Sequence, residues 1–380
     1  MGVVYGGRSG EHEVSVASAA AVLKHLDKDR YEAIPIRIEK TGRWTVAERP
    51  PTAMSAAEVH EHLRLEGSRA ARPNRETHLV AYPSEEPMLT IERAAHDQGE
   101  SSALVTGAGL DVIFPVLHGP YGEDGCIQGL LELANVPYVG AGVLGSAVGM
   151  DKAVMKTLFS AAGLPVAEAL TFLRHQWARD SKAAAGAVAR ELGFPVFVKP
   201  ANLGSSVGIS KVKAAAGLSA AVELAFEFDR KVVIERAVAN TRELECAVLG
   251  NDAPEASVVG EVVPSREFYD YEAKYLDDGS KIIVPAELDA ATAESIRQLS
   301  VQAFTCLDLS GMARVDFLMN AATNELFVNE VNTLPGFTAI SQYPKLWEAS
   351  GLPYAALIDR LIALAIERHA AKQRLRTSIT

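Results

Sequence analysis

Two carboxylates and an amide near the C-terminal end of the sequence have the types and spacing of metal ligands. Asp316 lies in one run of alternating apolar and polar residues, and Glu330 and Asn332 lie in the next. Because strand side chains alternate between two faces, Arg314 shares a face with Asp316, and Glu330 shares a face with Asn332. Pairing of the two runs would gather hard oxygen ligands, which suit Mg²⁺ and the substrate phosphates that Mg²⁺ usually holds.

An ordinary hairpin explains the same pattern without a ligand. Residues 320–325 are polar and suit a hairpin turn between the two runs. Antiparallel strands commonly turn one polar face to water, so residue types alone support a metal site and a solvated hairpin equally. The rest of the chain must decide between them.

Glycine-rich loops follow two of the strands that the sequence predicts in its N-terminal part. Residues 3–5 form a short apolar strand, residues 6–10 are rich in glycine, and residues 14–26 have the pattern of a helix. The apolar strand at residues 112–117 ends in a second glycine-rich stretch, residues 118–125. In open α/β sheets ligands bind beyond the carboxyl ends of the strands, so both loops are candidates for a substrate pocket. The first loop also fits a simple tight turn with solvated charges.

Two further loops have phosphate-binding patterns of unequal weight. Residues 140–145 match G-x-G-x-x-G formally. We reject a dinucleotide site there, because the preceding strand is short and contains Pro137, and a lone fingerprint is often coincidental. Residues 199–208 join two strands through a Gly-Ser-Ser sequence at 204–206. The backbone N–H groups and hydroxyls of such a loop can cover a phosphate, although G-x-x-x-x-G-K-[ST] is absent.

Composition limits the classes of protein to which the chain can belong. Its 380 residues are enough for two or three domains, and 48% hydrophobic and 22% charged residues are ordinary for a globular protein. A formal net charge of −11 argues against nucleic acid as a partner, although a local basic pocket could still bind nucleotide phosphates. The apolar stretch at residues 352–366 is interrupted by Asp359 and Arg360, so we expect no membrane span.

Cysteine usage and the N-terminal sequence indicate the compartment. Cys126, Cys246 and Cys306 are odd in number and far apart, which predicts free thiols and neither a disulfide framework nor a zinc site. The chain enters a strand at once, without a basic n-region or a cleavage site, so no signal peptide is visible. We therefore expect a cytoplasmic protein.

Six segments, taken in order, resemble the D-alanine–D-alanine ligase family of the ATP-grasp fold. They read GGRSGEHEVS, HGPYGEDG, KPANLGSSVGISK, FYDYEAKY, ARVDF and NEVNTLPGFT, and they span nearly the whole chain. The resemblance implies an α/β and α+β protein with an N-terminal open parallel-sheet domain (1–140), a central ATP-grasp domain (141–236) and a C-terminal ATP-grasp domain (237–380). We expect a lid loop at residues 265–281, because this segment is long and charged. The segment at 44–111 departs from the family and leaves the strand count of the first domain open.

The resemblance also implies a reaction. ATP and two D-alanines give D-alanyl-D-alanine, ADP and phosphate, for synthesis of the peptidoglycan precursor. The first carboxylate attacks the γ-phosphate to form an acyl phosphate, and the second amine displaces phosphate through a tetrahedral intermediate. Such chemistry depends on positioning and on cations around the phosphates, and the family uses two Mg²⁺ or Mn²⁺ ions with ATP. We expect a homodimer that binds neither nucleic acid nor membrane.

The residues that the resemblance assigns to metal and nucleotide lie in the second half of the chain or shortly before it. Asp316, Glu330 and Asn332 match the ligands of the two metal ions. The following residues match contacts of the nucleotide: Lys152, Lys199 and Lys274 at the phosphates, Ser206 in the covering loop, Glu235 at the adenine and Glu243 at the ribose. Arg236 stands where the family usually has Lys, so the adenine contacts there are expected to differ.

The residues assigned to the amino acids come from both ends of the chain. Glu13 matches the group that holds the ammonium of the first substrate, with Ser205 and Tyr275 linked to it by hydrogen bonds. His118 matches a pocket residue paired with a glutamate, here Glu123. The remaining assignments are Arg314 and the backbone of Gly336 at the tetrahedral oxyanion, and Ser341 near the carboxylate of the second substrate.

Three alternatives to this activity stay open. An enzyme of the same fold could make the D-alanyl-D-lactate ester, although ester-forming relatives commonly carry Phe at the position of Tyr275. Another carboxylate–amine ligase is the second alternative. A nucleotide-binding regulatory protein with lost chemistry is the third. Intact Arg314, Asp316 and Glu330 speak against the third, because a binding module needs no second metal ligand and no oxyanion donor.

Overall fold

Parallel pairing of apolar strands forms the first sheet, as the sequence predicts. β1 (Gly2–Gly6) lies between β2 (Ile34–Ile38) and β7 (Ile113–Val116), and β3 (Trp44–Val46) adds an antiparallel edge. Every residue of β1 and β7 is buried, as expected for a parallel sheet covered on both faces. In place of the strand expected at residues 137–139 there is one isolated bridge to β7. The computed structural model describes these residues of the chain: 1–47, 50–51, 58–59, 75–95, 101–263, 281–338 and 340–376.

Helices cover this sheet and lead to the central part of the chain. Two of them agree with the sequence patterns: α1 (His12–His25) and α3 (Cys126–Ala134). The single helix expected at residues 146–162 is two helices, α4 (Val143–Met150) and α5 (Lys152–Ala161). Asp151 interrupts them, because its backbone is extended and its carboxylate accepts hydrogen bonds from the first N–H groups of α5.

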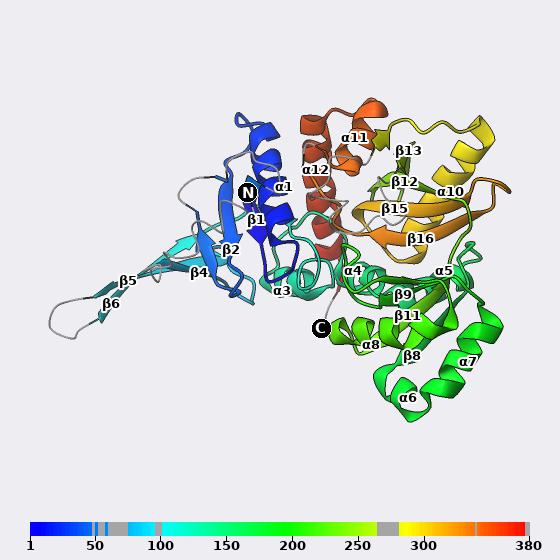
Figure 1. Ribbon diagram of the computed structural model, residues 1–380. Helices are drawn as coiled ribbons and strands as arrows, with labels where there is room; N and C mark the ends of the chain where they lie inside the picture. Colours follow the sequence, from blue (N-terminus) through cyan, green and yellow to red (C-terminus); the bar gives the residue numbers. More distant parts are fainter. Residues whose placement is uncertain are drawn as a thin grey trace.

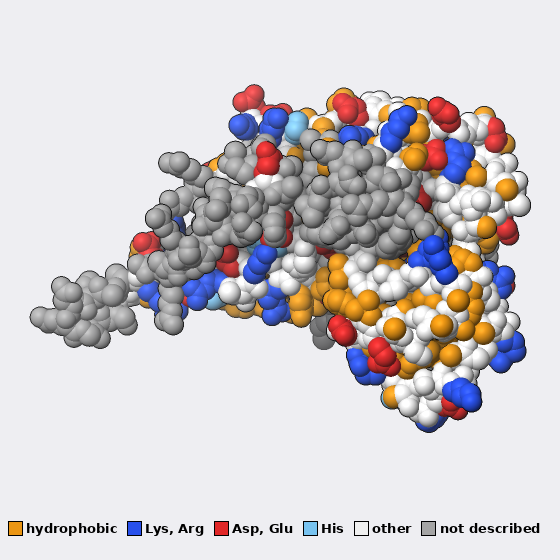
Figure 2. Space-filling model, in the orientation of Figure 1, with side chains coloured by type: hydrophobic (Ala, Val, Ile, Leu, Met, Phe, Trp, Pro, Cys, Tyr) orange, Lys and Arg blue, Asp and Glu red, His pale blue; other side chains and the backbone are white. Residues whose placement is uncertain are grey.

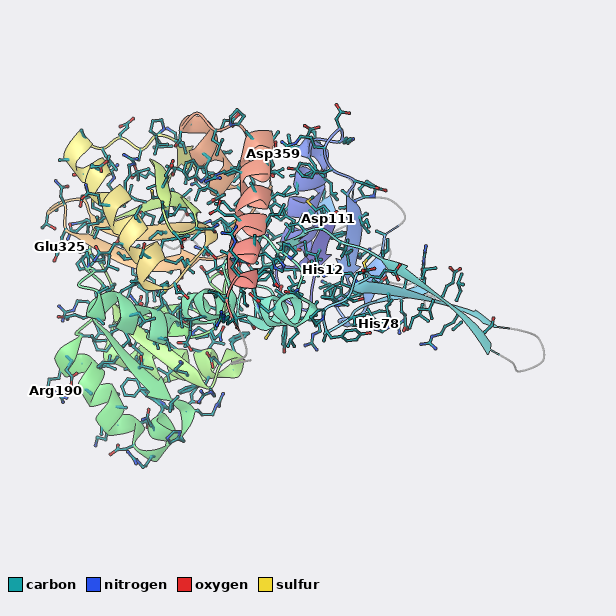
Figure 3. The ribbon with its side chains drawn as sticks, turned by 180° about the vertical axis from the view of Figure 1, so that it is seen from behind. His12, His78, Asp111, Arg190, Glu325 and Asp359 are labelled. Atoms are coloured by element: carbon teal, nitrogen blue, oxygen red, sulfur yellow. The ribbon has the colours of Figure 1, made fainter. Side chains whose placement is uncertain are left out.

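A three-stranded sheet projects from the N-terminal part of the molecule. β4 (Arg75–Leu79), β5 (Met88–Ala95) and β6 (Ser101–Ala108) pair antiparallel in chain order. Figures 1 and 3, from opposite sides, show the β5–β6 ribbon pointing away from the other sheets. The prediction of a surface elaboration with some strand is confirmed: β5 contains the strand expected at residues 88–91, whereas the strand expected at 78–82 lies earlier, at residues 75–79. The sequence does not indicate β6, because SSALVTGA lacks clear alternation of apolar and polar residues.

An antiparallel sheet of four strands forms the central part of the chain. Its strand order is β10 (Ser210–Val212), β9 (Val196–Pro200), β11 (Lys231–Arg236) and β8 (Ala169–Leu173). Three helices cover one face of this sheet: α6 (Arg174–Arg179), α7 (Ser181–Glu191) and α8 (Leu218–Phe228). Val196, Val198 and Val232 belong to the core on that face. Alternation therefore places Lys199 and Glu235 on the other face.

A third antiparallel sheet contains the polar hairpin. Its strand order is β14 (Lys281–Ile283), β13 (Glu255–Val263), β12 (Thr241–Gly250), β15 (Gly311–Asn320) and β16 (Leu326–Asn332). α10 (Ala290–Cys306) packs against the sheet. Burial alternates along β15, with Val315 and Phe317 in the core and Arg314 and Asp316 on the opposite face. The predicted hairpin and its two faces are confirmed.

The last helices belong to a core that also contains the first strand. α11 (Gln342–Ala349) is followed by α12 (Tyr354–Gln373), which contacts α1. Leu357 and Leu361 of α12 share a buried apolar cluster with Val3 of β1. Among the described residues no single helix is long and apolar enough to cross a membrane, and α11 and α12 meet those criteria only as a pair bent by 104°.

Candidate functional site

The two strands of the polar hairpin bring Asp316, Glu330 and Asn332 together. Asp316 is opposite Glu330, and Arg314 is opposite Asn332, in the register of β15 and β16. The guanidinium of Arg314 donates two hydrogen bonds to the Asp316 carboxylate, at 2.7 and 2.8 Å, and the Asn332 amide donates a third at 2.9 Å. The hairpin face is therefore a connected polar site and not a row of separate solvated side chains.

A bulge in β16 changes which side chains reach this face. The register shifts just after the pair of Asp316 and Glu330, so Asn329 is an extra residue in β16. Val328 and Val331 are both buried, whereas the two residues between them are not. Two consecutive polar side chains therefore reach the site, and strict alternation could not have predicted Asn329 there.

Arg314 is held between two acids. Besides Asp316, the carboxylate of Glu245 on β12 lies 3.1 Å from the guanidinium. Burial alone would lower the pKa of Arg314, but the charges of Asp316 and Glu245 raise it well above its usual value. The guanidinium therefore carries a permanent positive charge at the centre of the hairpin face.

Two lysines from the central part of the chain reach the hairpin. Lys152, at the start of α5, donates to the carbonyl of Leu203 at 2.8 Å, and its Nζ lies 3.6 Å from a carboxylate oxygen of Glu330. Lys199 of β9 donates to the amide oxygen of Asn329 at 3.4 Å. These contacts join the central sheet to the sheet that contains the polar hairpin, and β9 lies below β16 in Figure 1. Positive charge from one sheet thus lies beside the carboxylates of the other.

Glu235 lies between two buried lysines. Lys199 Nζ is 2.5 Å from one carboxylate oxygen, and Lys156 Nζ is 2.8 Å from the other. Burial by itself would raise the pKa of Glu235, but the charges of Lys156 and Lys199 lower it to about 2. Burial likewise opposes the charged form of Lys199, yet Glu235 and Glu330 raise the pKa of that ammonium. The sequence analysis names Lys199 and Glu235 but not Lys156, which in the sequence resembles any other helix residue.

The Ser205 hydroxyl donates a hydrogen bond to the Glu11 carboxylate, whereas the sequence analysis expected Glu13 as the acceptor. Glu11 is buried, and a Cβ added at Gly119 or at Gly204 would lie 2.6 or 3.0 Å from its Oε2 atom. Three loops that are far apart in the sequence therefore meet around this one carboxylate. The segment GEHE contains two acids, Glu11 and Glu13, and residue type alone does not indicate which of them contacts Ser205.

Glu13 has different surroundings. It lies in the first turn of α1, and its buried carboxylate accepts a hydrogen bond from Lys40 at 2.6 Å. Burial would raise the pKa of Glu13, but Lys40 lowers it. Residues two apart near the start of a helix do not face the same side. Glu13 therefore ties α1 to the turn after β2, and the expected partner of Ser205 is corrected to Glu11.

His118 lies between Glu123 and the segment after β16. Its Nδ1 atom is 3.0 Å from the carbonyl oxygen of Leu334 and 3.9 Å from the Glu123 carboxylate, and its Nε2 atom is 3.3 Å from Ser18 Oγ. Burial would lower the pKa of His118, but Glu123, Glu11 and the Leu334 carbonyl raise it. The expected pairing with Glu123 is present at ion-pair distance.

The turn after β16 folds around Gly336. A Cβ at Gly336 would lie 2.8 Å from Ser341 Oγ, so the missing side chain lets this hydroxyl approach the backbone. Ser341 Oγ accepts a hydrogen bond from Thr338 N at 2.9 Å and shares one with Thr338 Oγ1 at 2.8 Å. Phe337 N donates to Ser18 Oγ at 3.2 Å, which joins the turn to α1. The structure thus brings Gly336 and Ser341 into one turn.

Two more of the assigned residues, Ser206 and Glu243, belong to described segments, and two do not. Ser206 has a positive φ of 58°, so the loop over the central sheet turns sharply there. Glu243 is on β12, two residues before Glu245 on the same strand. Lys274 and Tyr275 lie outside the described residues, as does all of the expected lid except its last residue.

Comparison with known proteins decides the family. Family models described as D-ala D-ala ligase N-terminus and D-ala D-ala ligase C-terminus match residues 1–141 and 158–363. The chain belongs to the D-alanine–D-alanine ligase family. This membership confirms the predicted ATP-grasp fold and ligase class, and it implies the use of ATP.

Relatives in the D-alanine–D-alanine ligase family match the chain over nearly its whole length. A D-alanine–D-alanine ligase of Geobacillus kaustophilus (strain HTA426) is 48% identical over 375 residues, covering 99% of this chain and 96% of the relative. One from Chloroherpeton thalassium (strain ATCC 35110 / GB-78) is 46% identical, covering 98% of both chains. The solved D-alanine–D-alanine ligase of Coxiella burnetii superposes with a TM-score of 0.79 at 37% identity, covering 98% and 95%. The VanG D-Ala:D-Ser ligase of Enterococcus faecalis has a TM-score of 0.76 at 35% identity, covering 96% and 98%.

The donor chemistry of the hairpin fits the metal ions expected for a D-alanine–D-alanine ligase. Asp316 and Glu330 supply carboxylate oxygens, and Asn332 supplies an amide oxygen, which are ligands that Mg²⁺ takes. Within the described residues no group of three or more His, Cys, Asp or Glu side chains is placed to hold a metal by itself. A metal ion here would therefore complete its shell with phosphate and water oxygens, as Mg²⁺ commonly does.

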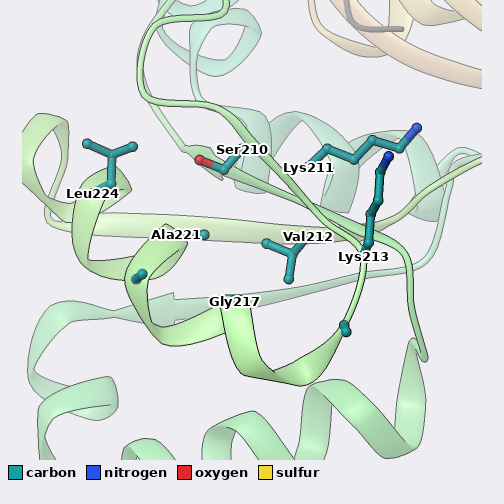
Figure 4. A pocket seen from close by; sticks show the side chains of 9 residues that line it. Ser210, Lys211, Val212, Lys213, Gly217, Ala221 and Leu224 are labelled. Atoms are coloured by element: carbon teal, nitrogen blue, oxygen red, sulfur yellow. The ribbon is translucent and has the colours of Figure 1, made fainter.

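This ligase-family chain also has a pocket that contains no residue of the polar hairpin. Figure 2 shows acidic and basic side chains interspersed over the described part of one face. A pocket of about 480 Å³ lies between β10 and α8, at the outer edge of the central sheet (Figure 4). Lys211 and Lys213 border it side by side in Figure 4, and Lys211 Nζ is 5.7 Å from the ring centre of Phe197. The lining residues come from β10, α8 and the segment that joins them, and none belongs to the carboxylate hairpin.

Proposed function

We propose that this protein joins two D-alanines into D-alanyl-D-alanine with ATP, giving ADP and phosphate, for synthesis of the cell-wall precursor. The observation that carries the proposal is the contact of Lys152 and Lys199 with Glu330 and Asn329 of the hairpin. A phosphate bound between the two sheets would meet cations from one sheet and metal-binding carboxylates from the other. That arrangement suits phosphoryl transfer, in which catalysis is mainly positioning and charge neutralisation. The names of relatives that match over nearly the whole chain support the substrate.

In the proposed first step, the carboxylate of one D-alanine attacks the γ-phosphorus of ATP. A bond forms between a carboxylate oxygen and phosphorus, and the bond from phosphorus to the bridging oxygen breaks. ADP leaves with the electron pair, and the products are an acyl phosphate and ADP. Lys152 and Lys199 reduce the repulsion between the two anions. When bound, Mg²⁺ held by Asp316, Glu330 and Asn332 would neutralise phosphate charge.

In the proposed second step, the neutral amine of the other D-alanine attacks the acyl carbon and a carbon–nitrogen bond forms. The bond from that carbon to the phosphate oxygen then breaks, phosphate leaves with the electron pair, and the nitrogen gives up one proton to the departing phosphate. We assign oxyanion stabilisation to Arg314 and the backbone of Gly336, because Arg314 keeps its charge on the hairpin face and Gly336 lies in the turn that follows it. We assign the second carboxylate to the turn containing Ser341, which packs directly on Gly336.

We assign the ammonium of the first D-alanine to Glu11 in place of Glu13. The hydrogen bond from Ser205 couples Glu11 to the loop over the central sheet, which we expect to cover the phosphates. The charge of Glu13 is already matched by Lys40 at 2.6 Å. An ammonium at Glu11 would place the attached carboxylate of the substrate near the loops that bind ATP, as the first step requires.

The second substrate, the metal ion and the assembly are the finer parts of the proposal. VanG, which is similar over 96% of this chain, is named a D-Ala:D-Ser ligase, so related proteins differ in their second substrate. We propose D-alanine at the second site, Mg²⁺ or Mn²⁺ as the metal, and a homodimer in the cytoplasm. Within the described residues all three cysteines are free thiols, which agrees with a reducing compartment. Light scattering of the purified protein tests the dimer.

The experiment that tests the activity measures phosphate release with ATP and Mg²⁺ across D-alanine, D-serine, D-lactate and L-alanine, with products resolved by mass spectrometry. We expect phosphate release with D-alanine alone and D-alanyl-D-alanine as the product. L-Alanine should give neither. Phosphate release that does not depend on D-alanine would overturn the proposal, and a mixed product with D-serine or D-lactate as the main species would reassign the second site.

A further inference from the structure

Lys156 is a buried lysine to which the proposed reaction gives no role. It lies on α5, four residues after Lys152, so the two side chains share one face of the helix. Both are buried, together with Met155 and Phe159 on the same helix. A lysine is seldom buried unless it is paired, so its partner indicates what it does.

That partner is the Glu235 carboxylate, which Lys156 shares with Lys199. The side chains of the three residues are 8%, 3% and 10% exposed. They come from α5, β11 and β9, so the trio joins the helix that carries Lys152 to the strand that carries Lys199. Each carboxylate oxygen faces a different ammonium.

The charges of this trio do not cancel. One carboxylate lies between two ammonium groups, so the trio keeps a net positive charge. The charge of Lys199 is surrounded by acids, since Glu330 and Glu243 act on it as well as Glu235. Lys156 offsets part of that negative field. Burial would raise the pKa of Glu235, but the charges of Lys156 and Lys199 together lower it.

A purely structural ion pair would not need the second lysine. Lys199 alone would satisfy the charge of Glu235, and burying another ammonium is costly. The 2.8 Å contact between Lys156 and Glu235 lacks hydrogen-bond geometry, and within the described residues Lys156 Nζ has no hydrogen bond. A second ion pair, Lys231 with Asp151, already joins β11 to the N-terminal end of α5.

We infer that Lys156 is a positioning residue for the nucleotide: it holds one oxygen of Glu235, so that the same carboxylate orients Lys199 without cancelling its charge. The inference rests on the proposed function, because it takes Lys199 as a contact of ATP. Without Lys156 the full charge of Glu235 falls on Lys199, and Lys199 is drawn away from an anionic ligand. The loss is therefore one of nucleotide affinity and not of the acyl-transfer step.

The test compares Lys156→Met with the wild type. Methionine keeps an apolar stem of similar length and removes the charge. We expect the dissociation constant of ADP with Mg²⁺, measured by calorimetry, to rise about tenfold or more, the order expected when the charged hydrogen bond from Lys199 to a phosphate is lost. The KM for ATP should rise in parallel, with a smaller change in kcat and in the KM for D-alanine. Lys156→Arg keeps the charge and should keep ADP affinity closer to the wild-type value than Lys156→Met does.

Lys231→Met is the matched control. It removes an ion pair between the same two elements, β11 and α5, without touching Glu235. We expect a lower melting temperature with unchanged ADP affinity. The double variant Lys156→Met with Glu235→Gln should bind ADP no more weakly than Glu235→Gln alone, because Lys156 acts only through that carboxylate.

The possible outcomes separate this inference from the proposed function. A wild type that releases phosphate with D-alanine, together with a folded Lys156→Met that binds ADP equally well, would overturn the role of Lys156 alone. An additive loss in the double variant, or an Arg variant as weak as the Met variant, would overturn it too. A wild type that neither binds ADP nor releases phosphate would overturn the proposed function, and with it this inference.

Discussion

Glu330 is the residue whose substitution tests the carboxylate hairpin most directly. Its side chain faces Lys152 and not the core, so we expect Glu330→Gln to fold normally. Turnover should fall by about two orders of magnitude or more, at or beyond the upper end of the roughly 10–100-fold loss that follows removal of a group that only supports a metal ligand. Raising the Mg²⁺ concentration should recover part of the lost turnover. Circular dichroism and phosphate release at several Mg²⁺ concentrations provide the measurements.

The control for that variant lies on the same hairpin. Glu325 is exposed in the turn between β15 and β16, and Figure 3 labels it at the far edge of the sheet. Glu325→Gln should leave turnover and Mg²⁺ dependence unchanged. Near wild-type turnover of Glu330→Gln at low Mg²⁺ would remove Glu330 from the metal site.

The two acids near the N-terminus allow a second comparison between single residues. Glu11→Gln keeps the shape of the group that accepts from Ser205 but removes its charge, so the KM for D-alanine should rise roughly 10–100-fold, as for the loss of a hydrogen bond to a charged group. Glu13→Gln should mainly lower stability, because it breaks the ion pair with Lys40. Initial rates against D-alanine concentration, with thermal melts of both variants, decide between them. The larger KM effect in Glu13→Gln would restore Glu13 as the ammonium site.

Residue types and spacing predicted much of this site and missed a definable part. The alternation rule places Asp316 and Arg314 on one face, and the structure agrees. Glu11 was missed because GEHE offers two acids, and only the three-dimensional meeting of loops separates them. Lys156 was missed because its importance comes from a shared partner, which no local pattern records.

At the scale of elements, His118 joins the loop after β7 to the segment after β16. Its pKa is raised in the folded protein by Glu123 and Glu11 despite burial. A group with a raised folded-state pKa stabilises the fold below its unfolded pKa, and the contribution is lost as pH rises through the folded value. The wild type should therefore exceed His118→Gln in free energy of unfolding most strongly at about pH 6, near the ordinary histidine pKa, with the difference shrinking toward alkaline pH.

Urea denaturation of both proteins at a series of pH values checks this expectation. A stability difference for His118→Gln that is flat or that grows with pH would contradict the role given to Glu123.

The turn after β16 gives another prediction at this scale. Gly336→Ala would place a methyl group 2.8 Å from Ser341 Oγ and push that hydroxyl off Thr338. We expect turnover to fall by about tenfold or more, because displacements of about 1 Å can cost that much in a positioned site. Gly186→Ala is the control, since nothing lies within 4 Å of its Cβ position on α7. It should gain roughly 0.5–1 kcal/mol of stability and keep full turnover. Steady-state rates and denaturation curves of the two variants measure both effects, and unchanged turnover in Gly336→Ala would show that the turn tolerates the shift.

The elements that sequence reasoning misplaced have local physical causes. One helix became α4 and α5 because Asp151 caps the second, and a cap in mid-pattern does not disturb apolar spacing. β16 has a bulge at Asn329, and a bulge breaks the period of two on which strand reading depends. α3 was predicted well because Gly125 precedes its first residue. The hairpin of β15 and β16 was predicted well because apolar and polar residues alternate along β15.

At the scale of the whole molecule, Arg368 of α12 holds distant segments together. Its guanidinium donates to the carbonyls of Tyr138 and Gly140 and to Ser310 Oγ, and it lies 4.4 Å from the ring centre of Tyr138. Arg368→Ala should lower the free energy of unfolding by roughly 2–4 kcal/mol, because several buried acceptors lose their donor. Arg374→Ala, at the exposed end of α12, should change it by less than about 0.5 kcal/mol. Chemical denaturation measures both, and equal losses would mean that Arg368 acts only as a surface residue.

The family resemblance implied a parallel-sheet domain and two ATP-grasp domains, and apolar patterns indicated several of their strands. Sequence reasoning could not find how they share a core. Nothing in the pattern of residues 352–366 says that Leu357 will pack near Val3, because both segments are simply apolar. The domain boundaries predicted at residues 140 and 236 therefore stay predictions. One buried cluster contains residues from both ends of the chain.

That shared core has a consequence for how the protein is made. The ribosome releases β1 long before it releases α12, because Gly2 and Tyr354 lie at opposite ends of the chain. At typical rates of synthesis the delay is roughly 20–70 seconds. During that time α1 packs on the first sheet but lacks its contact with α12, so the buried cluster that holds Val3 and Phe114 is incomplete and a nascent chain would offer its apolar side chains to chaperones. The N-terminal part can reach its final packing only after translation is nearly complete.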